Sequence, residues 1–460
     1  MKTEDEQPAY ERPELNRPAS ATPTEPELEH ELPGAEQLGE RDPYAAFRYR
    51  DYRLYAIGGT LNALGAQMQS ITIGWEIYER THSALSLGLV GLVQAAPVIL
   101  LSLPAGQVAD RYNRRVILLI ALVLSALCSL GLAVLSYAHG PIEWMYLLLL
   151  GFGIIGAFSG PVTASILPQL VPAPVFSNAV TWNSTRWQLA ATIGPALGGF
   201  VIAIGHSAIP VYLITASTTL WFFGFVCALR TRQAERAAET VTFASLLAGI
   251  HFVRDSKLIL ATITMDMFAV LFGGATALLP IFAKDILHVG PSGLGWLRAA
   301  PAVGALVMAL TLAHLPPMRK AGKSLLWAVA GFGAATIVFG LSRNFWLSLV
   351  MLAITGALDN ISVVVRHTLV QVLTPDHMRG RVSAVNNMFI GTSNELGEFE
   401  SGMMAKFFTP AGSVVIGGIG TILVVLGVAA LWPQVRGLGA LQDVQPEDDA
   451  VEGTKKLKAA

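Results

Sequence analysis

Residues 106–115 read GQVADRYNRR and lie between two long apolar runs. Four charged residues crowd into the last six positions, namely Asp110, Arg111, Arg114 and Arg115. Charges at this density cannot lie in hydrocarbon, because each would lose its hydration, so the segment is predicted to be a tight turn at a membrane surface. Its three arginines predict that this surface is the cytoplasmic one.

The composition agrees with a chain that crosses a membrane many times. Of its 460 residues, 53% are hydrophobic and only 14% are charged, whereas a water-soluble chain has about 25% charged residues. The nine histidines show no metal-ligand spacing, the motifs GxxxxGKS/T, GxSxG and HExxH do not occur, and Lys and Arg form no basic footprint. We therefore expect no metal, no cofactor, no enzyme activity and no nucleic-acid partner.

The apolar runs predict twelve transmembrane helices in two groups of six. Each run is long enough to cross about 30 Å of hydrocarbon at about 1.5 Å per residue. The predicted spans are 54–79, 84–109, 114–138, 142–170, 175–205 and 209–230, and then 258–287, 291–315, 323–342, 345–373, 378–408 and 411–434.

The distribution of Lys and Arg predicts the orientation of these helices. Seventeen of them lie in loops or at helix ends on the side that carries both termini, and four lie in or beside the opposite loops, namely Arg80, Lys284, Arg343 and Lys406. The positive-inside rule then places both termini in the cytoplasm. We expect a multi-pass protein of the inner (cytoplasmic) cell membrane of a bacterium.

The segments outside the apolar runs divide the chain into predicted domains. Residues 1–45 contain seven prolines and many Glu, which predicts a disordered acidic tail, with a regulatory docking segment as the alternative. Residues 46–230 and 258–436 are predicted six-helix bundles. They are joined by a linker at 231–257 whose apolar residues recur at helical spacing, as in an amphipathic helix on the membrane surface. Residues 437–460 are predicted to be a second disordered tail.

An internal repeat relates the two halves. A shift of 203 positions brings Asn183 onto Asn386 and Gly199 onto Gly402, among four such matches in about thirty residues. Parallel repeats of two six-helix halves are a known plan for secondary transporters, in which substrate is held between the halves. The predicted fold is an all-α membrane protein with two six-helix bundles, related as parallel repeats, around a central cavity.

The segment GQVADRYNRR resembles the signature loop between the second and third helices of the major facilitator superfamily, and the resemblance covers about residues 45–436. Within that superfamily, GPALGG at 194–199 is similar to the glycine-proline motif of drug/proton antiporters. SNELGEFESG at 393–402 resembles the branch that contains the bacterial enterobactin exporter. The resemblance implies a carrier that works by alternating access, exports its substrate and is driven by protons. It also implies that the first, fourth, seventh and tenth helices line the cavity.

The charged loop is the candidate gate. The resemblance implies that Gly106 belongs to the gating loop and that Asp110 latches the two bundles together on the cytoplasmic side. Arg111 and Arg115 would complete this latch or anchor at lipid headgroups. From the residues alone, Asp110 can also cap the next helix, and the arginines can simply obey the positive-inside rule.

A polar stripe runs along the first predicted helix. Asn62, Gln69 and Glu76 are spaced by seven residues, which is nearly two helical turns, so they share one face. A stripe about 21 Å long cannot face lipid. We therefore predict that it lines the substrate cavity or the bundle interior, although Glu76 lies near the outer end and could instead reach headgroup water.

Two acids lie deep in predicted helices of the second half. Asp266 lies about nine residues into its span, and Asp359 lies near the middle of its span with Ser362 and Arg366 on the same face. An ionised carboxylate there costs about 2.5–3.5 kcal/mol, so each acid is expected to be paired, protonated or hydrated. Asp266 and Asp359 are candidate proton-coupling residues, and Ser362 and Arg366 are candidate cavity residues. The alternative is a static ion pair, such as Asp359 with Arg366.

Three acids crowd together in the eleventh predicted helix, namely Glu395, Glu398 and Glu400. Because like charges repel, at least one of them is expected to hold a proton or to have a basic partner. All three are therefore candidates for proton coupling. Arg186 in the fifth span is the candidate partner, because the repeat places it close to these acids.

Small residues in the fifth predicted helix indicate close packing. Gly194 and Gly198 are four residues apart and Gly199 follows, which makes a seam that another helix can approach closely. Pro195 is expected to bend the helix. In one interpretation these residues serve helix packing alone. In the other, the bend at Pro195 is also used when the bundles rock.

Together these features predict a secondary active exporter of small amphiphilic organic molecules, siderophore-like or drug-like, coupled to inward proton flow. The expected partners are the small-molecule substrate, protons and the lipid bilayer, and we expect a monomer. Two alternatives stay open. One is an importer or lipid flippase of the same fold, and the other is a membrane receptor or scaffold that transports nothing.

Overall fold

The structure is a computed structural model that describes residues 42–230, 250–316, 318–375 and 378–441. The predicted acidic tail lies almost entirely outside these residues, as do most of the predicted linker and most of the C-terminal tail. All helices described below belong to one unit, which begins at residue 45.

Twelve long helices make up the described part of the chain, which contains no strand. Their ends agree with the predicted spans to within a few residues. The seventh span continues past α8 through η4 (Ala275–Leu278), α9 (Leu279–Ile281) and η5 (Phe282–Ile286). The long helices are α1 (Arg50–Thr81), α2 (Ala84–Arg111), α3 (Arg114–Tyr137), α4 (Ile142–Leu170), α5 (Phe176–Gly205), α6 (Ile209–Cys227), α8 (Lys257–Phe272), α10 (Gly290–His314), α11 (Ala321–Leu341), α12 (Phe345–Leu373), α13 (Arg379–Phe407) and α14 (Pro410–Leu431).

The charged segment 106–115 forms the tight turn that its sequence predicts. Helix α2 ends at Arg111 and α3 begins at Arg114, so only two residues separate them. Asn113 caps α3, because its side-chain oxygen accepts hydrogen bonds from the backbone nitrogens of Arg115 (3.0 Å) and Val116 (3.4 Å). The capping role considered for Asp110 therefore belongs to Asn113.

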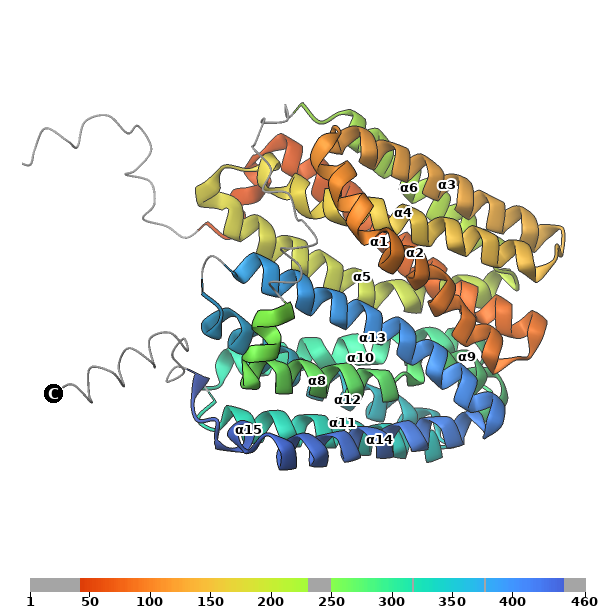
Figure 1. Ribbon diagram of the computed structural model, residues 1–460. Helices are drawn as coiled ribbons and strands as arrows, with labels where there is room; N and C mark the ends of the chain where they lie inside the picture. Colours follow the sequence, from red (N-terminus) through yellow and green to blue (C-terminus); the bar gives the residue numbers. More distant parts are fainter. Residues whose placement is uncertain (1–41, 231–249, 317, 376–377, 442–460) are drawn as a thin grey trace, which may run out of the picture. The chain divides into compact units, whose positions relative to one another are not determined.

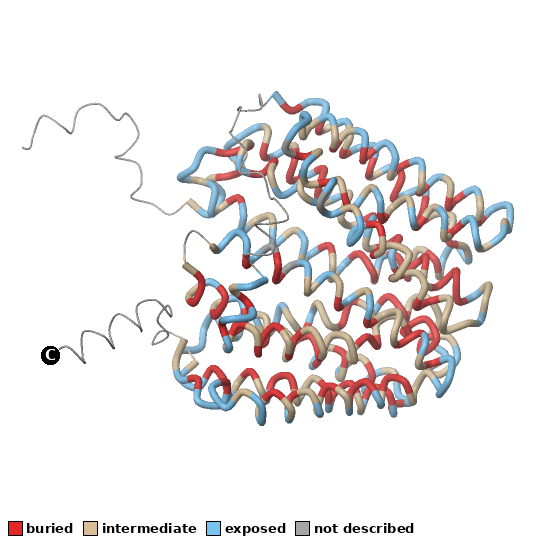
Figure 2. Tube along the Cα trace, in the orientation of Figure 1, coloured by how far each residue is buried: buried red, intermediate tan, exposed pale blue. Residues whose placement is uncertain are grey.

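Ten of the described helices are long and apolar enough to cross a membrane by length and composition alone. Helices α1 and α13 are missing from this set because of their polar side chains, yet they are 32 and 29 residues long and pack among the others. Large apolar side chains are exposed along the outer helices, for example Trp221 (66%) and Trp327 (77%), and Figure 2 shows exposed positions along these helices. Because soluble proteins rarely expose so much apolar surface, the protein is a multi-pass membrane protein.

The helices form two bundles, α1–α6 and α8–α14, which meet along two seams (Figure 1). Helix α5 packs against α10 in one seam, and α13 packs against α2 in the other. The internal repeat pairs α5 with α13 and α2 with α10, so the two seams are equivalent. This is the arrangement expected of two parallel repeats.

Buried apolar residues form three clusters, and their distribution distinguishes the two ends of the helices. We call the end where α1 begins and α14 finishes the terminal face, and the opposite end the far face. A shared core toward the far face combines residues of both bundles, such as Ile77 and Leu87 with Phe282 and Leu294. Toward the terminal face the buried clusters are separate, one within residues 46–229 and the other within 253–438. The bundles are therefore packed together at the far face.

Candidate functional site

A polar cavity of about 140 Å³ lies between the two bundles. Helices α1 and α2 form one wall, and α10, α13 and the segment after α8 form the other. Its lining is mixed, with apolar residues such as Leu87 and Leu294 beside charged ones. The polar residues of the lining are Ser70, Gln94, Thr276, Arg298, Glu395 and Glu398.

A charge cluster of one guanidinium and two carboxylates occupies this cavity. Nη2 of Arg298 lies 3.8 Å from Oε1 of Glu398, and these side chains are 30% and 25% exposed. A Cβ atom on Gly91 would lie 3.1 Å from Oε2 of both Glu395 and Glu398, so both carboxylates reach the same point on α2. With one cation beside two acids, the cluster becomes neutral when one of the acids holds a proton.

Sequence reasoning identified the two acids but missed their partner. It proposed Arg186, whose Nε donates instead to Oδ1 of Asn183 at 2.8 Å in its own helix. Arg298, eight residues into α10, takes the predicted place beside Glu398. An arginine that far inside an apolar span is the signal that could have revealed it. Glu400, the third acid of the predicted cluster, is not among the residues that line the cavity.

Backbone contacts between the bundles close the cavity toward the far face. Helices α2 and α13 cross at Gly88 and Gly402, where a Cβ atom on Gly402 would lie 2.7 Å from the Cα of Gly88. Helices α5 and α10 cross in the same way, since a Cβ atom on Gly199 would lie 3.0 Å from the Cα of Gly295. Any larger side chain would force the backbones apart, so each seam depends on glycine.

Polar contacts at the far face add to this closure. The Tyr78 hydroxyl in α1 donates a hydrogen bond to the Asp285 carboxylate in η5. Beside this contact, between the residue after Tyr78 and the residue before Asp285, Nζ of Lys284 lies 3.8 Å from Oε1 of Glu79. Both contacts join the N-terminal bundle to the C-terminal bundle, so opening the far face must break them.

The predicted gating loop lies at the terminal face, and its described contacts stay within the N-terminal bundle. Arg115 donates from Nε to the carbonyl oxygen of Val226 (3.1 Å) and from Nη2 to that of Cys227 (2.5 Å), so it ties the start of α3 to the end of α6. Arg111 is exposed. A Cβ atom on Gly106 would meet no atom within 4 Å. The side chain of Asp110 is outside the described part of the structure.

The polar stripe of α1 faces the interior of the N-terminal bundle. Oδ1 of Asn62 accepts from Thr219 at 2.9 Å, and Oε1 of Gln69 accepts from Ser129 at 2.8 Å. Glu76 is buried, pairs with Arg80 and accepts a 2.7 Å hydrogen bond from Tyr212. Gln69 and Glu76 thus join α1 to its neighbours inside the bundle, while Asn62 also lines a second cavity in that bundle.

The deep acids of the second bundle differ from each other. Asp266 in α8 forms an ion pair with Arg366 in α12, and the two side chains are only 6% and 3% exposed. The static pair considered for Arg366 therefore exists, but its acid is Asp266 and not Asp359. Asp359 has no hydrogen bond or ion pair with any described residue. Ser362 is buried on α12, one turn before Arg366.

The glycines of α5 make close helix contacts, as their spacing indicates. A Cβ atom on Gly194 would lie 2.5 Å from the Cβ of Gln67 in α1, and one on Gly198 would lie 2.9 Å from the Cα of Met68. Gly199 faces α10 instead. Together with the buried Pro195, these residues hold α5 against α1 on one side and against the C-terminal bundle on the other.

Comparisons with known proteins agree with this architecture. Residues 41–448 match the family described as transmembrane secretion effectors. The enterobactin exporter EntS of Citrobacter koseri is 25% identical over 386 residues, which are 84% of this chain and 92% of that protein. EntS of Escherichia coli O157:H7 is also 25% identical, over 403 residues that cover 87% of this chain and 96% of that one.

Solved structures of transporters share the fold. A bacterial homologue of the human lysosomal transporter Spinster, in an inward-facing and occupied conformation, aligns with a TM-score of 0.66 at 15% identity and covers 86% of this chain and 97% of that one. The nucleoside transporter NupG aligns with a TM-score of 0.67 at 12% identity, over 83% and 99% of the two chains. At these identities the likeness concerns the fold alone.

Proposed function

The chain belongs to the transmembrane secretion effector family of the major facilitator superfamily, and on this basis we propose that it exports small amphiphilic organic molecules in exchange for protons. It would act as a monomer in the inner membrane of a bacterium, with both termini in the cytoplasm. The observation that carries the proposal is the cluster of Arg298, Glu395 and Glu398 in a cavity between the bundles. The cluster has one more carboxylate than it has cations, so it can bind a proton. It also lies in a cavity that residues of both bundles line.

The charge balance of the cluster suggests how exchange works. Arg298 neutralises one carboxylate at a time, so the second is stable in the cavity when it is protonated or when it accepts hydrogen bonds from the substrate. A proton and a substrate group would then compete for the same place. Competition of this kind couples the export of substrate to the import of protons, although the proton and the substrate never touch each other.

Alternation of access would use the two seams. The far face, closed through Gly88–Gly402, Gly199–Gly295 and Tyr78–Asp285, would open as the terminal face closes. The loop with Gly106, Asp110, Arg111 and Arg115 stays our proposal for the gate at the terminal face. The face packed together here is the far one. With the terminal face proposed to be cytoplasmic, we infer that this conformation is that of a carrier open toward the cytoplasm.

Among the other acids, the contacts support a static role for Asp266 and Glu76, since each is buried beside an arginine. Asp359 stays proposed as a secondary proton site, and Glu400, which does not line the cavity, stays proposed as the proton site only if Glu398 proves not to serve coupling. The names of the curated relatives favour a siderophore such as enterobactin as cargo. An importer or flippase of the same fold would use the same seams, and the direction of substrate transport distinguishes these alternatives.

Inside-out membrane vesicles test the proposal directly. With the vesicle lumen acidified, we expect radiolabelled enterobactin, or a drug such as ethidium, to accumulate inside, and we expect nigericin to abolish this accumulation by dissipating the pH gradient. Vesicles without the protein are the control. Loss of preloaded substrate from acidified vesicles would identify a proton-coupled importer, and no flux of any substrate under either gradient would favour a receptor or scaffold.

A further inference from the structure

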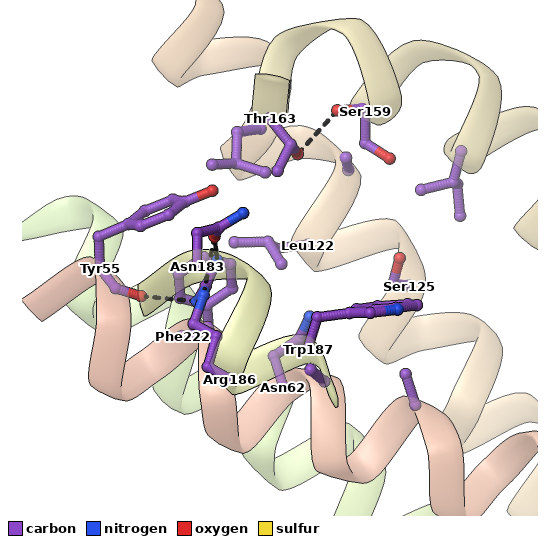
Figure 3. Close-up of a pocket in the computed structure, with 16 residues that line it drawn as sticks. Tyr55, Asn62, Leu122, Ser125, Ser159, Thr163, Asn183, Arg186, Trp187 and Phe222 are labelled. Carbon is purple, nitrogen blue, oxygen red and sulfur yellow. Dashed lines mark hydrogen bonds between the residues drawn. The ribbon is translucent and has the colours of Figure 1, made fainter. Parts of the chain in front are cut away.

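A second cavity, of about 310 Å³, lies entirely within the N-terminal bundle, among α1, α3, α4, α5 and α6 (Figure 3). It is separate from the charge cluster between the bundles, since the two cavities share no lining residue. Its volume is at the lower end of the range for small-molecule sites, about 300–1,000 Å³. A small molecule, or one arm of a larger molecule, fits such a space.

Arg186 supplies the only formal charge among the described residues that line this cavity. Its Nε donates to Oδ1 of Asn183 at 2.8 Å, its Nη2 donates to the same oxygen, and its Nη1 donates to the carbonyl oxygen of Tyr55 at 3.4 Å. The guanidinium also lies 4.9 Å from the centre of the Tyr55 ring. No described carboxylate pairs with it.

The guanidinium is therefore positioned but not neutralised. It has five N–H groups, of which the described contacts use three, and so two remain for a ligand. Arg186 lies ten residues into α5, about 15 Å along the helix at 1.5 Å per residue. A cation at this depth in a membrane protein is costly unless it binds a partner, and an anionic ligand would offset that cost.

The neighbouring helix is shaped for this arginine. A Cβ atom on Gly59 of α1 would lie only 1.9 Å from Nη1 of Arg186. Glycine at position 59 thus leaves the space that the guanidinium occupies, and even alanine would displace it. The position of the guanidinium therefore depends on both α5, which carries Arg186, and α1, which leaves space for it at Gly59.

The rest of the lining suits an aromatic group with polar substituents. Trp187 follows Arg186 on α5, is 59% exposed and presents its indole ring to the cavity (Figure 3). The amide of Asn62 and the hydroxyls of Ser125 and Ser159 offer hydrogen bonds on other sides. A flat ring can stack on the indole while an acidic group on that ring reaches the guanidinium.

We propose that this cavity binds a small aromatic carboxylate, with the carboxylate on Arg186 and the ring against Trp187. The proposal deepens the proposed export function and rests on it, because the bound group would be an anionic aromatic part of the exported molecule. It assigns recognition of an acid to the N-terminal bundle and proton exchange to the charge cluster between the bundles.

Calorimetric binding to the full-length protein in lipid nanodiscs tests this assignment, with 1-naphthoate and its neutral isostere 1-naphthamide as probes. The wild-type protein is expected to bind naphthoate about tenfold or more tightly than naphthamide, because a hydrogen-bonded ion pair to arginine distinguishes them. Arg186→Met should abolish this preference, and Arg186→Lys should restore part of it. Trp187→Ala should weaken both probes alike.

Gly59→Ala provides a second test that leaves every charge in place. It should reduce the preference for naphthoate by displacing the guanidinium, whereas Gly224→Ala, at an exposed glycine of α6 with no atom near its added methyl group, should change nothing. Equal binding of both probes by the wild-type protein, or an unchanged preference in Arg186→Met and Gly59→Ala, would overturn the proposal. Since binding needs no gradient, vesicles that fail to accumulate substrate while naphthoate still binds would refute export and not the cavity.

Discussion

Replacing Glu398 by Gln is the most informative single change at the charge cluster. The substitution keeps the shape of the side chain and removes its charge, so Arg298 loses the carboxylate that lies 3.8 Å from it. Among the described residues that line the cavity, Glu395 is then the only acid left beside this arginine. We expect Glu395 to pair with Arg298 permanently, which leaves no carboxylate free to take up a proton.

The expected loss of transport follows from the distance between Arg298 and Glu398 and from the exposure of their side chains. Two unit charges 3.8 Å apart interact by about 4 kcal/mol at an effective dielectric constant of about 20. The side chains are 30% and 25% exposed, so solvent screens part of this energy, and we expect a net loss of about 1–3 kcal/mol. That corresponds to roughly a fivefold to 150-fold fall in the rate of proton-driven accumulation.

Two assays on the same inside-out vesicles separate coupling from substrate handling. Accumulation driven by an acidic lumen should fall by this factor in Glu398→Gln. Substrate counterflow, in which unlabelled substrate inside exchanges for labelled substrate outside at equal pH, should persist because it needs no proton. Glu400→Gln is the matched comparison on the same helix, and we expect it to keep both activities, since Glu400 does not line the cavity.

Two results would refute this reasoning. One is full proton-driven accumulation by Glu398→Gln, which would mean that the carboxylate is not needed for coupling. The other is equal loss of both activities, which would mean that Glu398 holds substrate or structure and does not serve proton exchange. A Glu400→Gln protein that loses accumulation but keeps counterflow would move the proton site to the other face of α13.

Three further predictions concern the helices around the cluster. Asp266→Asn should destabilise the protein by about 3–5 kcal/mol, because Arg366 would stay buried without its partner; an unchanged thermal unfolding midpoint in detergent would contradict this. Gly199→Val should weaken closure of the far face by about 1–3 kcal/mol, since its Cβ would lie 2.3 Å from a backbone oxygen of α10. Labelling of Ser70→Cys by a maleimide added from the far side should then rise, and unchanged labelling would argue against the seam. Arg115→Gln should cost about 1–3 kcal/mol through two lost hydrogen bonds to α6, while accumulation that disappears in a folded Arg115→Gln protein would support the gating role over a purely structural one.

The spans, their number and the turn at 106–115 could be predicted because each depends on local properties. A run of apolar side chains is stable in hydrocarbon wherever its neighbours lie, and a cluster such as Arg111, Arg114 and Arg115 is unstable there. The polar helices α1 and α13 were also found from sequence, although composition alone does not identify them as spans. Glu395 and Glu398 stood out for the same reason, as charges in a predicted span.

The partners of those charges were decided by the tertiary structure. Whether Arg366 meets Asp359 on its own helix or Asp266 on α8, and whether Arg186 or Arg298 lies beside Glu398, depends on how the helices cross and rotate. The crossings depend in turn on backbone contacts such as Gly88 with Gly402, which join residues more than 300 positions apart. The free energy of moving a side chain from water into hydrocarbon depends on that residue alone, so it can be estimated from the sequence. Pairing energies depend on distances between helices, and only the packed bundles define those distances.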